Sequence, residues 1–526
     1  MTDLSGFSRM TFVDQVNTIE KIKAQRSTQA IPGLFNLCES EAHNDALLFM
    51  IKTTIMALLP LDKEQTEKGL SLKDPIARRL CIEAAGQERF MSTVPILMDM
   101  CATERDETLL LEIFTALSRI HPAGAEELFR DNLKNQNPSI AAACANALGF
   151  YRDRASAHAL FDIIENAQQE GNYETCDIVT LNAITSLGKM HHDTAAELLT
   201  QMIHHKNPTV RRIIHEKLIE TGPSALPLLA DIFNGDDGDA MIMSANVLGV
   251  KASHRACDVL VQTMDRRGEF NANIRFAIYE ALGKIPSVES LVCITEGLKE
   301  KEEMVLMGIV FNLDSQFDPL VLEKTREILL EKNEHSQMLV HTIISAHALN
   351  IFDALYMEDD TIAELFIKEI KASSSPDTIR VFRKALEKLG KMATAHDLLD
   401  PDVQSYKKQV IVADTSMSML LFYTNILSDM GFDCTTVLNG KQAWDYLKTD
   451  RAFDLIITNM NMPEMDGVEL TRLVRGKTTL DNAPILMVTT ETHDSQISLA
   501  QKAGVNHFIH KPFTSQELGT MIAEIT

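Results

Sequence analysis

The sequence has 526 residues, of which 45% are hydrophobic and 24% are charged, and its formal net charge is −24. This composition is typical of a folded protein with more than one hydrophobic core, and the acidic excess argues against a nucleic-acid partner. Eight cysteines without a CxxC pair argue against a disulfide framework or a zinc site.

The first apolar run, residues 46–61, predicts a buried helix. Lys52 interrupts the run and Pro60 closes it, so it is a poor candidate for a membrane span. The N-terminus has no basic stretch followed by an apolar core, so we expect no signal peptide. These features predict a cytoplasmic protein without a membrane span.

From about residue 30 to residue 392, the sequence predicts a series of apolar helices. Most of them end with a small residue followed by leucine and glycine. One unit of 34 residues separates Gly249 from Gly283, and a fixed period of this size is typical of a helical solenoid. We expect these glycines to adopt the left-handed conformation that ends a helix. They are Gly86, Gly149, Gly188, Gly249, Gly283 and Gly390.

A second marker stands upstream of the glycines and predicts helix starts. Asp or Asn can cap a helix, and proline is tolerated in its first turn. Apolar second helices follow, for example at residues 94–98 and 225–229. The marker occurs as Asp74-Pro75, Asn137-Pro138, Asn207-Pro208, Asn273-Ile274 and Pro376-Asp377.

These markers resemble HEAT repeats, in a short-period form that is also similar to the repeats of phycobilin-lyase-related proteins. The resemblance implies an all-α HEAT-like solenoid over residues 1–392, with the repeats clearest from 72 to 392. Tetratricopeptide and ankyrin repeats have compatible lengths, but their sequence patterns are missing. Solenoid surfaces are extended, so we expect this region to bind protein partners.

Histidine pairs at His191-His192 and His204-His205 raise the question of a metal site. Adjacent helical residues point to different sides, and no carboxylate or third ligand completes a recognisable spacing. The region also lacks a nucleophile elbow, a phosphate loop and a metalloprotease motif. We expect neither a metal site nor an enzyme here.

Residues 393–406 lose the repeat pattern and are expected to form a linker or a short capping turn. From residue 407 the pattern becomes one of alternating strands and helices, which predicts a doubly wound α/β domain with its site at the carboxyl ends of the strands. Strands are expected at 409–413, 433–437, 454–458, 484–489 and 507–509, and helices from about 417, at 440–447, 467–475 and 495–503, and after Thr514.

Residues 407–526 resemble a response-regulator receiver domain, with a flavodoxin-like five-stranded parallel sheet. The strand and Pro/Gly loop around Asn459 and Pro463, and Lys511-Pro512-Phe513, carry the resemblance. In that family the third strand ends in an aspartate that becomes phosphorylated, whereas this chain has Asn459. The resemblance implies a pocket formed by Asp414, Thr415, Asn461, Thr489, Phe508 and Lys511, in which Thr415 stands in place of a second acidic residue.

An amide is a weaker nucleophile than a carboxylate, and Mg²⁺ favours charged oxygen ligands. We therefore expect no catalytic residue and no cofactor, with Mg²⁺ held only weakly by Asp414, Asn459 and Asn461. Lys511 is predicted to pair with Asp414, and Asn459 to contribute hydrogen bonds to the same pocket.

The sequence favours a non-catalytic signalling scaffold or adaptor of a bacterial two-component or phosphorelay system. By resemblance, residues near 495–503 and 514–524 are candidate docking surfaces for other proteins. Two alternatives remain: a conventional phosphorelay response regulator with a solenoid output module, and a lyase-like or ligand-binding HEAT-repeat protein. The partner and the oligomeric state are left open.

Overall fold

The computed structural model describes residues 4, 6–40, 45–169, 176–191, 193–373, 375–398, 408–449, 452–478, 480, 482–490 and 494–526. The chain divides into two compact units. The first consists of Met1–Glu170 and Cys176–Leu198, and the second consists mainly of Leu199–Thr526. Among the described residues, no helix is long and apolar enough to cross a membrane.

The first unit is helical throughout its described part. Helix α3 includes most of the apolar run predicted to be a buried helix, and Pro60 lies in the 3₁₀ turn that follows it. The helices are α1 Phe12–Ala24, α2 Ile31–Ser40, α3 Asp45–Leu58, α4 Lys63–Gly69, α5 Pro75–Gln87, α6 Val94–Thr103, α7 Glu107–Ile120, α8 Glu126–Asp131, α9 Pro138–Leu148, α10 Arg154–Gln169, α11 Ile178–Lys189 and α12 Asp193–Gln201, of which α12 runs into the second unit.

The second unit begins with more helices of the same kind. We call α1–α25 the helical array. In this unit its helices are α13 Pro208–Glu220, α14 Ala225–Asp231, α15 Gly238–Lys251, α16 His254–Met264, α17 Ala272–Gly283, α18 Val288–Glu296, α19 Glu303–Ser315, α20 Pro319–Leu330, α21 Glu334–Ser345, α22 Leu349–Glu358, α23 Asp360–Ala372, α24 Pro376–Lys388 and α25 Met392–His396.

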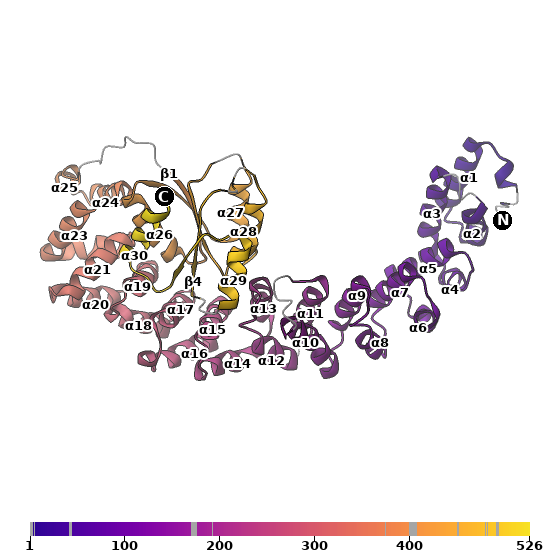
Figure 1. Cartoon of the computed structure of the whole chain (residues 1–526), viewed down its shortest axis with the longest axis horizontal. Helices are drawn as coiled ribbons and strands as arrows, with labels where there is room; N and C mark the ends of the chain where they lie inside the picture. Colours follow the sequence, from indigo (N-terminus) through magenta and orange to yellow (C-terminus); the bar gives the residue numbers. More distant parts are fainter. Residues whose placement is uncertain are drawn as a thin grey trace. The chain divides into compact units, whose positions relative to one another are not determined.

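Alternate helices of the array pack against one another in each unit. In the first unit α5, α7, α9 and α11 are successive neighbours, and in the second unit α13, α15, α17, α19 and α21 are. We call this second set the inner row, because the C-terminal domain lies against it (Figure 1). The period of about 34 residues predicted from the glycines therefore corresponds to one helix pair.

The role predicted for most of the repeat glycines is wrong. Of the six, only Gly390 has a positive φ, at 75°. A Cβ on Gly249 would lie 2.7 Å from Cα of Ala281 in the next inner helix, and one on Gly86 would lie 2.8 Å from Cα of Ala116. At Gly86, Gly149 and Gly249 the next helix approaches too closely for a side chain.

The predicted caps are mostly confirmed. The side chains of Asp74, Asn137 and Asn207 accept backbone N–H groups at the starts of α5, α9 and α13, with proline next in each helix. The cap of α17 is Asn271 and not Asn273, which lies inside the first turn. Because Asn271 accepts the backbone N–H at the start of the helix, the side chain of Asn273 is not needed as the cap.

The array runs past the boundary expected at residue 392. Helix α25 includes residues 393–396 of the expected linker, and Arg383 donates a hydrogen bond to the carbonyl oxygen of Leu398. The rest of that linker from residue 399, with Asp400-Pro401, lies outside the described residues.

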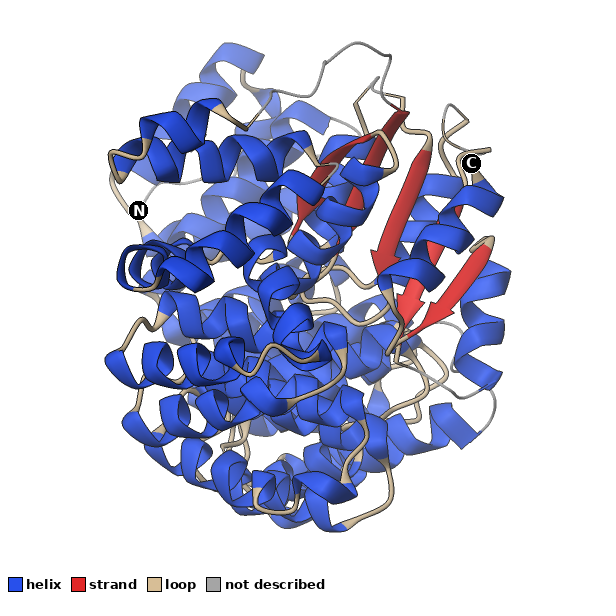
Figure 2. Ribbon diagram, turned by 90° about the vertical axis from the view of Figure 1, so that its left-hand side faces the viewer, coloured by secondary structure: helices blue, strands red, loops and turns tan. Residues whose placement is uncertain are grey.

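The C-terminal α/β domain has the five predicted strands. They form one parallel sheet in the order β2-β1-β3-β4-β5, and the strands run side by side in Figure 2. Their short apolar runs are buried, as expected for a sheet covered on both faces. The strands are β1 Lys408–Ala413, β2 Phe432–Val437, β3 Leu455–Asn459, β4 Ile485–Thr489 and β5 His507–His510.

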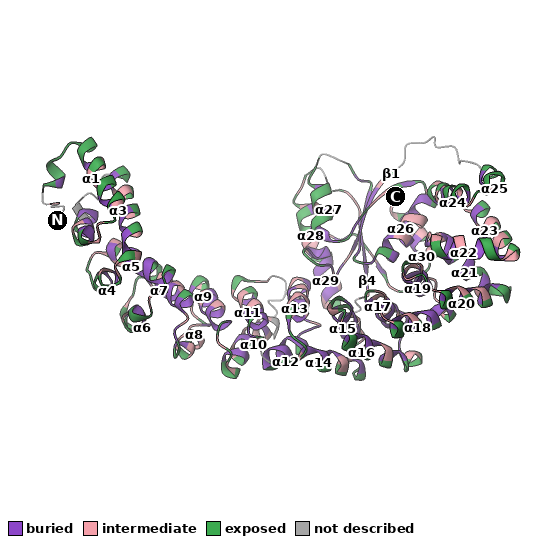
Figure 3. Ribbon diagram, turned by 180° about the vertical axis from the view of Figure 1, so that it is seen from behind, coloured by how far each residue is buried: buried purple, intermediate pink, exposed green. Residues whose placement is uncertain are grey.

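Five helices cover this sheet. The pair α26 and α30 packs on one face, while α27, α28 and α29 follow one another on the other face (Figure 1). Buried residues run along the strands between these layers (Figure 3). The helices are α26 Met417–Asp429, α27 Gly440–Leu447, α28 Gly467–Arg475, α29 Asp494–Ala503 and α30 Ser515–Ile525.

Candidate functional site

An ion pair lies at the carboxyl ends of the strands. Asp414 follows β1 and Lys511 follows β5, and Nζ of Lys511 lies 2.8 Å from Oδ2 of Asp414. The side chain of Asp414 is 2% exposed and that of Lys511 is 7% exposed. The pair predicted between these residues is therefore present, in a place where water screens it little.

Two further groups hold the Asp414 carboxylate. The backbone N–H of Ser416 donates to Oδ1 at 3.1 Å, and the hydroxyl of Tyr423 donates to Oδ2 at 3.3 Å. Burial, with the nearby Asp414 charge, raises the pKa of Tyr423 well above its ordinary value, so its hydroxyl stays a donor. Sequence reasoning missed Tyr423, although its position two turns into the first helix of the domain was a usable signal.

Asn459 ends β3 at the same edge and is half-buried. Its Nδ2 donates to the backbone carbonyl of Asn461 at 3.4 Å. The sequence predicted hydrogen bonds from Asn459 within the pocket, and the observed one goes to the loop rather than to Lys511. The amide therefore contacts the backbone of Asn461, another residue that was expected to hold Mg²⁺ weakly.

The other predicted site residues separate into two groups. Thr415 is exposed and lies beside Asp414, so it joins Asn459, Asn461 and Lys511 in lining one cavity. Thr489 is buried at the end of β4, where its carbonyl accepts from the Lys511 N–H at 2.9 Å. Phe508 packs against the core of the domain.

Arg211 of α13 contacts the loop after β3. It is 1% exposed, and its Nη2 and Nε lie 2.8 and 3.2 Å from Oδ1 of Asn461. Nη1 donates to the carbonyl of His205 at 2.9 Å and to Oε1 of Gln496 at the start of α29. Next to it, Thr209 donates to Asp466, the cap of α28, at 2.7 Å. Sequence reasoning missed this contact.

Comparison of Arg211 with the equivalent arginines of two other repeats explains why its side chain reaches the α/β domain. An arginine occupies the fourth position after the cap in α5, α13 and α17. Arg78 pairs with Glu104 at 3.1 Å, and Arg275 pairs with Glu300 at 3.0 Å. Each glutamate lies two residues before the N-cap of α7 or α19, the helix that packs next to the arginine's own helix. The residue in the same position before the N-cap of α15 is Gly235, so Arg211 has no such glutamate. Without that glutamate, Arg211 extends to the α/β domain.

Further hydrogen bonds join the array to the α/β domain. They come from α17, α19 and the end of α21, so the contact continues along the inner row. The bonds are Asn273 Nδ2 to the Lys511 carbonyl at 2.5 Å, Ser418 Oγ to Glu280 Oε1 at 2.7 Å, Ser515 Oγ to Glu303 Oε1 at 2.9 Å and Asn425 Nδ2 to the Ser345 carbonyl at 2.6 Å.

A cavity of about 340 Å³ lies between this edge of the sheet and the inner row. The α/β domain lines it with residues that follow β1, β3, β4 and β5, and the array lines it with α13, α15 and α17. Burial raises the pKa of Glu280 on its wall, against the opposing effects of Ser418 and Lys284.

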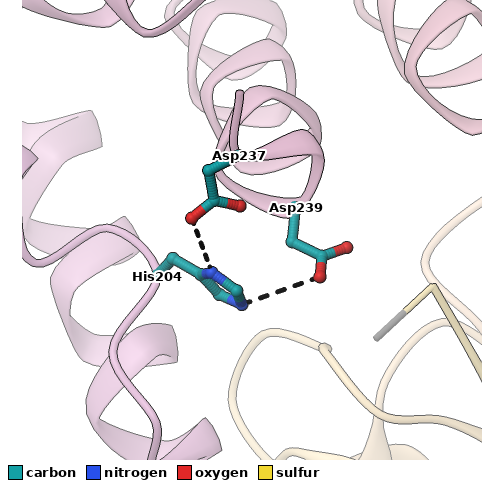
Figure 4. Close-up of side chains that lie close together, drawn as sticks. All are labelled: His204, Asp237 and Asp239. Carbon is teal, nitrogen blue, oxygen red and sulfur yellow. Dashed lines mark hydrogen bonds and ion pairs between the residues drawn. The ribbon is translucent and has the colours of Figure 1, made fainter. Parts of the chain in front are cut away.

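His204 forms a second cluster with two carboxylates (Figure 4). Its Nδ1 lies 2.9 Å from Asp237 Oδ2, and its Nε2 lies 3.8 Å from Asp239 Oδ2 and 3.3 Å from Gln496 Nε2. The hydrogen bond from His204 lowers the pKa of Asp237 to about 2. One ring nitrogen and one oxygen of each carboxylate lie within 4.8 Å of one another, so the two carboxylates that the sequence spacing did not reveal are close to His204 in the fold. The expected absence of a metal site at His204 stays a prediction.

Residues 410–523 match the family model of the response regulator receiver domain. Over 118 residues the chain is 38% identical to the chemotaxis protein CheY homolog of Campylobacter jejuni, which spans 22% of this chain and 91% of that protein. The chain belongs to the response regulator receiver family. Its α/β domain is the receiver domain, and the helical array lies outside the matched residues.

Two further proteins are similar to the receiver domain. The receiver domain is 39% identical over 111 residues to the chemotaxis protein CheY1 of Helicobacter pylori, with 21% of this chain and 90% of that protein aligned. The solved chemotaxis response regulator CheY4 of Vibrio cholerae is 29% identical, with 23% of this chain and 100% of that chain aligned and a TM-score of 0.22. A receiver domain implies a role in two-component signalling.

Proposed function

We propose that this protein is a non-catalytic signalling scaffold. In this proposal its receiver domain lacks the phosphoacceptor aspartate and is held against a HEAT-like array that binds other signalling proteins. The bond from Arg211 to Asn461 carries the proposal, because it occupies the loop beside the strand end where the chemistry of a receiver takes place.

The residue types at the strand ends support the loss of phosphorylation. Asn459 offers an amide where an attacking carboxylate is needed, and Thr415 leaves Asp414 as one acidic group beside β1. Lys511, the cation that would stabilise a transferring phosphoryl group, is held by Asp414 at 2.8 Å. Mg²⁺ would therefore meet one carboxylate already engaged by a cation, so we expect weak binding.

The covered position of the pocket supports a scaffold rather than a switch. Arg211, Thr209 and Asn273 contact the loops after β3 and β5, and a phosphodonor would have to displace them. The docking surfaces expected near 495–503 and 514–524 are partly used inside the chain, since Gln496 and Ser515 bond to the array. The remaining exposed parts of α29 and α30 stay candidate surfaces for partners.

Labelling with acetyl phosphate and Mg²⁺ tests the proposal. The unmodified chain should take up no phosphoryl group, while Asn459→Asp with Thr415→Asp should restore an acyl phosphate at residue 459. A parallel sample carries Gly235→Glu in addition to these two changes. This change is expected to release Arg211 from the receiver domain, so that a pocket that is only covered can be distinguished from a pocket that cannot react. Stoichiometric labelling of the unmodified chain would support a conventional phosphorelay response regulator instead.

A further inference from the structure

The cavity between the receiver domain and the inner row has the size and place of a ligand site. Its volume of about 340 Å³ is within the range of small-molecule pockets, which begins near 300 Å³. It lies at the carboxyl ends of the parallel strands, where open α/β sheets bind ligands. It is much larger than a phosphoryl group needs.

Two side chains of the array, those of Arg211 and Asn273, close the cavity on the side of the receiver domain. Arg211 contacts the receiver domain because Gly235 replaces the glutamate found in two related repeats. Asn273 adds a second contact because Asn271 already caps its helix. The contacts of Arg211 and Asn273 therefore close the cavity on the receiver side.

The wall formed by α15 is largely apolar, although Asp239 and Asn246 also line the cavity. Ile242, Met243, Val247 and Val250 lie along successive turns of this helix, and Phe276 of α17 stands beside them. Val250 is 51% exposed and so marks the side on which the cavity opens to solvent. This wall suits the hydrocarbon part of a ligand.

The cations that line the cavity differ in their partners: Arg211 is held by Asn461 and Gln496, whereas Lys284 is exposed at the edge of the cavity. Lys511 pairs with Asp414 at 2.8 Å, and Arg212 pairs with Glu216 at 3.0 Å. Among the residues that the structure describes, Lys284 has no ion pair within 4.0 Å. Its neighbour one turn earlier, Glu280, is bonded to Ser418, and burial raises the Glu280 pKa and so favours the neutral form.

We propose that the cavity binds a small organic anion, with its apolar body against α15 and its acid group paired by Lys284. The proposal rests on the docked receiver domain of the proposed function. The ligand would touch both parts of the second unit, so its binding would hold the receiver domain in place.

Calorimetric titration of the full chain with octanoate tests the proposal, with octan-1-ol as the uncharged counterpart. Octanoate should bind more tightly than octan-1-ol. Lys284→Gln should weaken octanoate binding about tenfold, the size expected for one charge-assisted contact. Val250→Trp, at an exposed position, should weaken both probes about tenfold by narrowing the opening. Lys299→Gln removes an exposed lysine outside the cavity and should change neither affinity.

The proposal is overturned if octanoate fails to bind, binds no tighter than octan-1-ol, or binds Lys284→Gln as well as the unmodified chain. Hydrogen exchange of residues 460–465 in the same samples reports whether the receiver domain is docked. An intact, docked chain that ignores octanoate overturns the ligand site alone, whereas phosphoryl labelling of the unmodified chain overturns the proposed function alone.

Discussion

The hydroxyl of Ser418 in the receiver domain donates a 2.7 Å hydrogen bond to Oε1 of Glu280 in α17 of the array. Glu280 lines the cavity between them, where Lys284 and Asp414 are the charged groups that act on it. Burial is the largest influence on this carboxyl group and raises its pKa above 4.5. We therefore expect the contact between the two domains to depend on the protonation of Glu280.

Glu280→Gln should make the docked structure less sensitive to pH. Because the folded pKa of Glu280 is raised, its contribution to stability is complete below the ordinary glutamate pKa and is lost as the pH rises through the raised value. A glutamine keeps an acceptor for Ser418 and has no charge to lose. Urea unfolding of the variant between pH 4.5 and pH 8 should show a smaller loss of stability than that of the unmodified chain.

Ser418→Ala serves as the opposite control, since the Ser418 hydrogen bond lowers the Glu280 pKa and its loss should raise it further. The pH dependence should then become steeper. Equal pH profiles for all three proteins would contradict this account of Glu280.

Gly235→Glu should weaken the docking of the receiver domain. The new glutamate would give Arg211 the intrarepeat partner that Glu104 gives Arg78. Gly235 has φ −87° and its added Cβ would meet only ordinary contacts, so the substitution fits the fold. We expect faster hydrogen exchange in residues 460–465, which contain the Arg211 partner Asn461.

Arg78→Ala provides a matched control, because it breaks the equivalent pair in the first unit. It should leave exchange in residues 460–465 unchanged. If Gly235→Glu also leaves that exchange unchanged, the repeat comparison does not explain the position of Arg211.

Gln496→Ala should destabilise the receiver domain within the full chain. Gln496 is 1% exposed and connects Arg211 to His204 through its two amide atoms. Its removal leaves a buried arginine donor without that acceptor, which costs about 1–3 kcal/mol. Trp444, the one tryptophan in the sequence, packs against the receiver core and reports the unfolding by its fluorescence.

Gln516→Ala, at an exposed position on α30, is the control for loss of a glutamine side chain. Its Trp444 transition should stay within about 0.5 kcal/mol of the unmodified chain. A Gln496→Ala transition in the same range would show that the buried amide contributes little.

Gly249→Ala should destabilise the array. The added methyl group would lie 2.7 Å from Cα of Ala281, so α15 and α17 would have to move apart. Overpacking of this kind costs about 1–3 kcal/mol. Gly222→Ala adds the same group with no atom within 4 Å and is the control. Helical circular dichroism in urea measures both, and equal midpoints would contradict the close-approach explanation.

Local patterns were enough to predict much of the fold. The strand expected at 484–489 appears as Ile485–Thr489, because a short β-branched and apolar run has few alternatives between turn residues. The helix start at Asn207-Pro208 was equally predictable, since a cap and a first-turn proline act within a few residues. The pairing of Asp414 with Lys511 followed from the shared strand edge once the fold was assigned.

What the sequence did not predict depends on distances between elements. The glycine pattern was visible, but the separation of α15 from α17 that requires Gly249 was not. The cap of α17 was assigned to Asn273 because Asn271 has the same residue type two positions away. Arg211 and Asn461 lie 250 residues apart, so no local pattern links them, although the missing glutamate at Gly235 was a signal available from aligned repeats.

That separation also determines the order in which the molecule is made. A ribosome adds roughly 5–20 residues per second, so α13 emerges about 10–50 seconds before the loop that its arginine contacts. During this time the cavity-lining residues of α15, among them Ile242 and Val247, lack the receiver domain opposite them. A growing or truncated chain therefore exposes apolar residues that face the receiver domain in the finished protein, and completing the C-terminal domain reduces the surface open to aggregation and to chaperones.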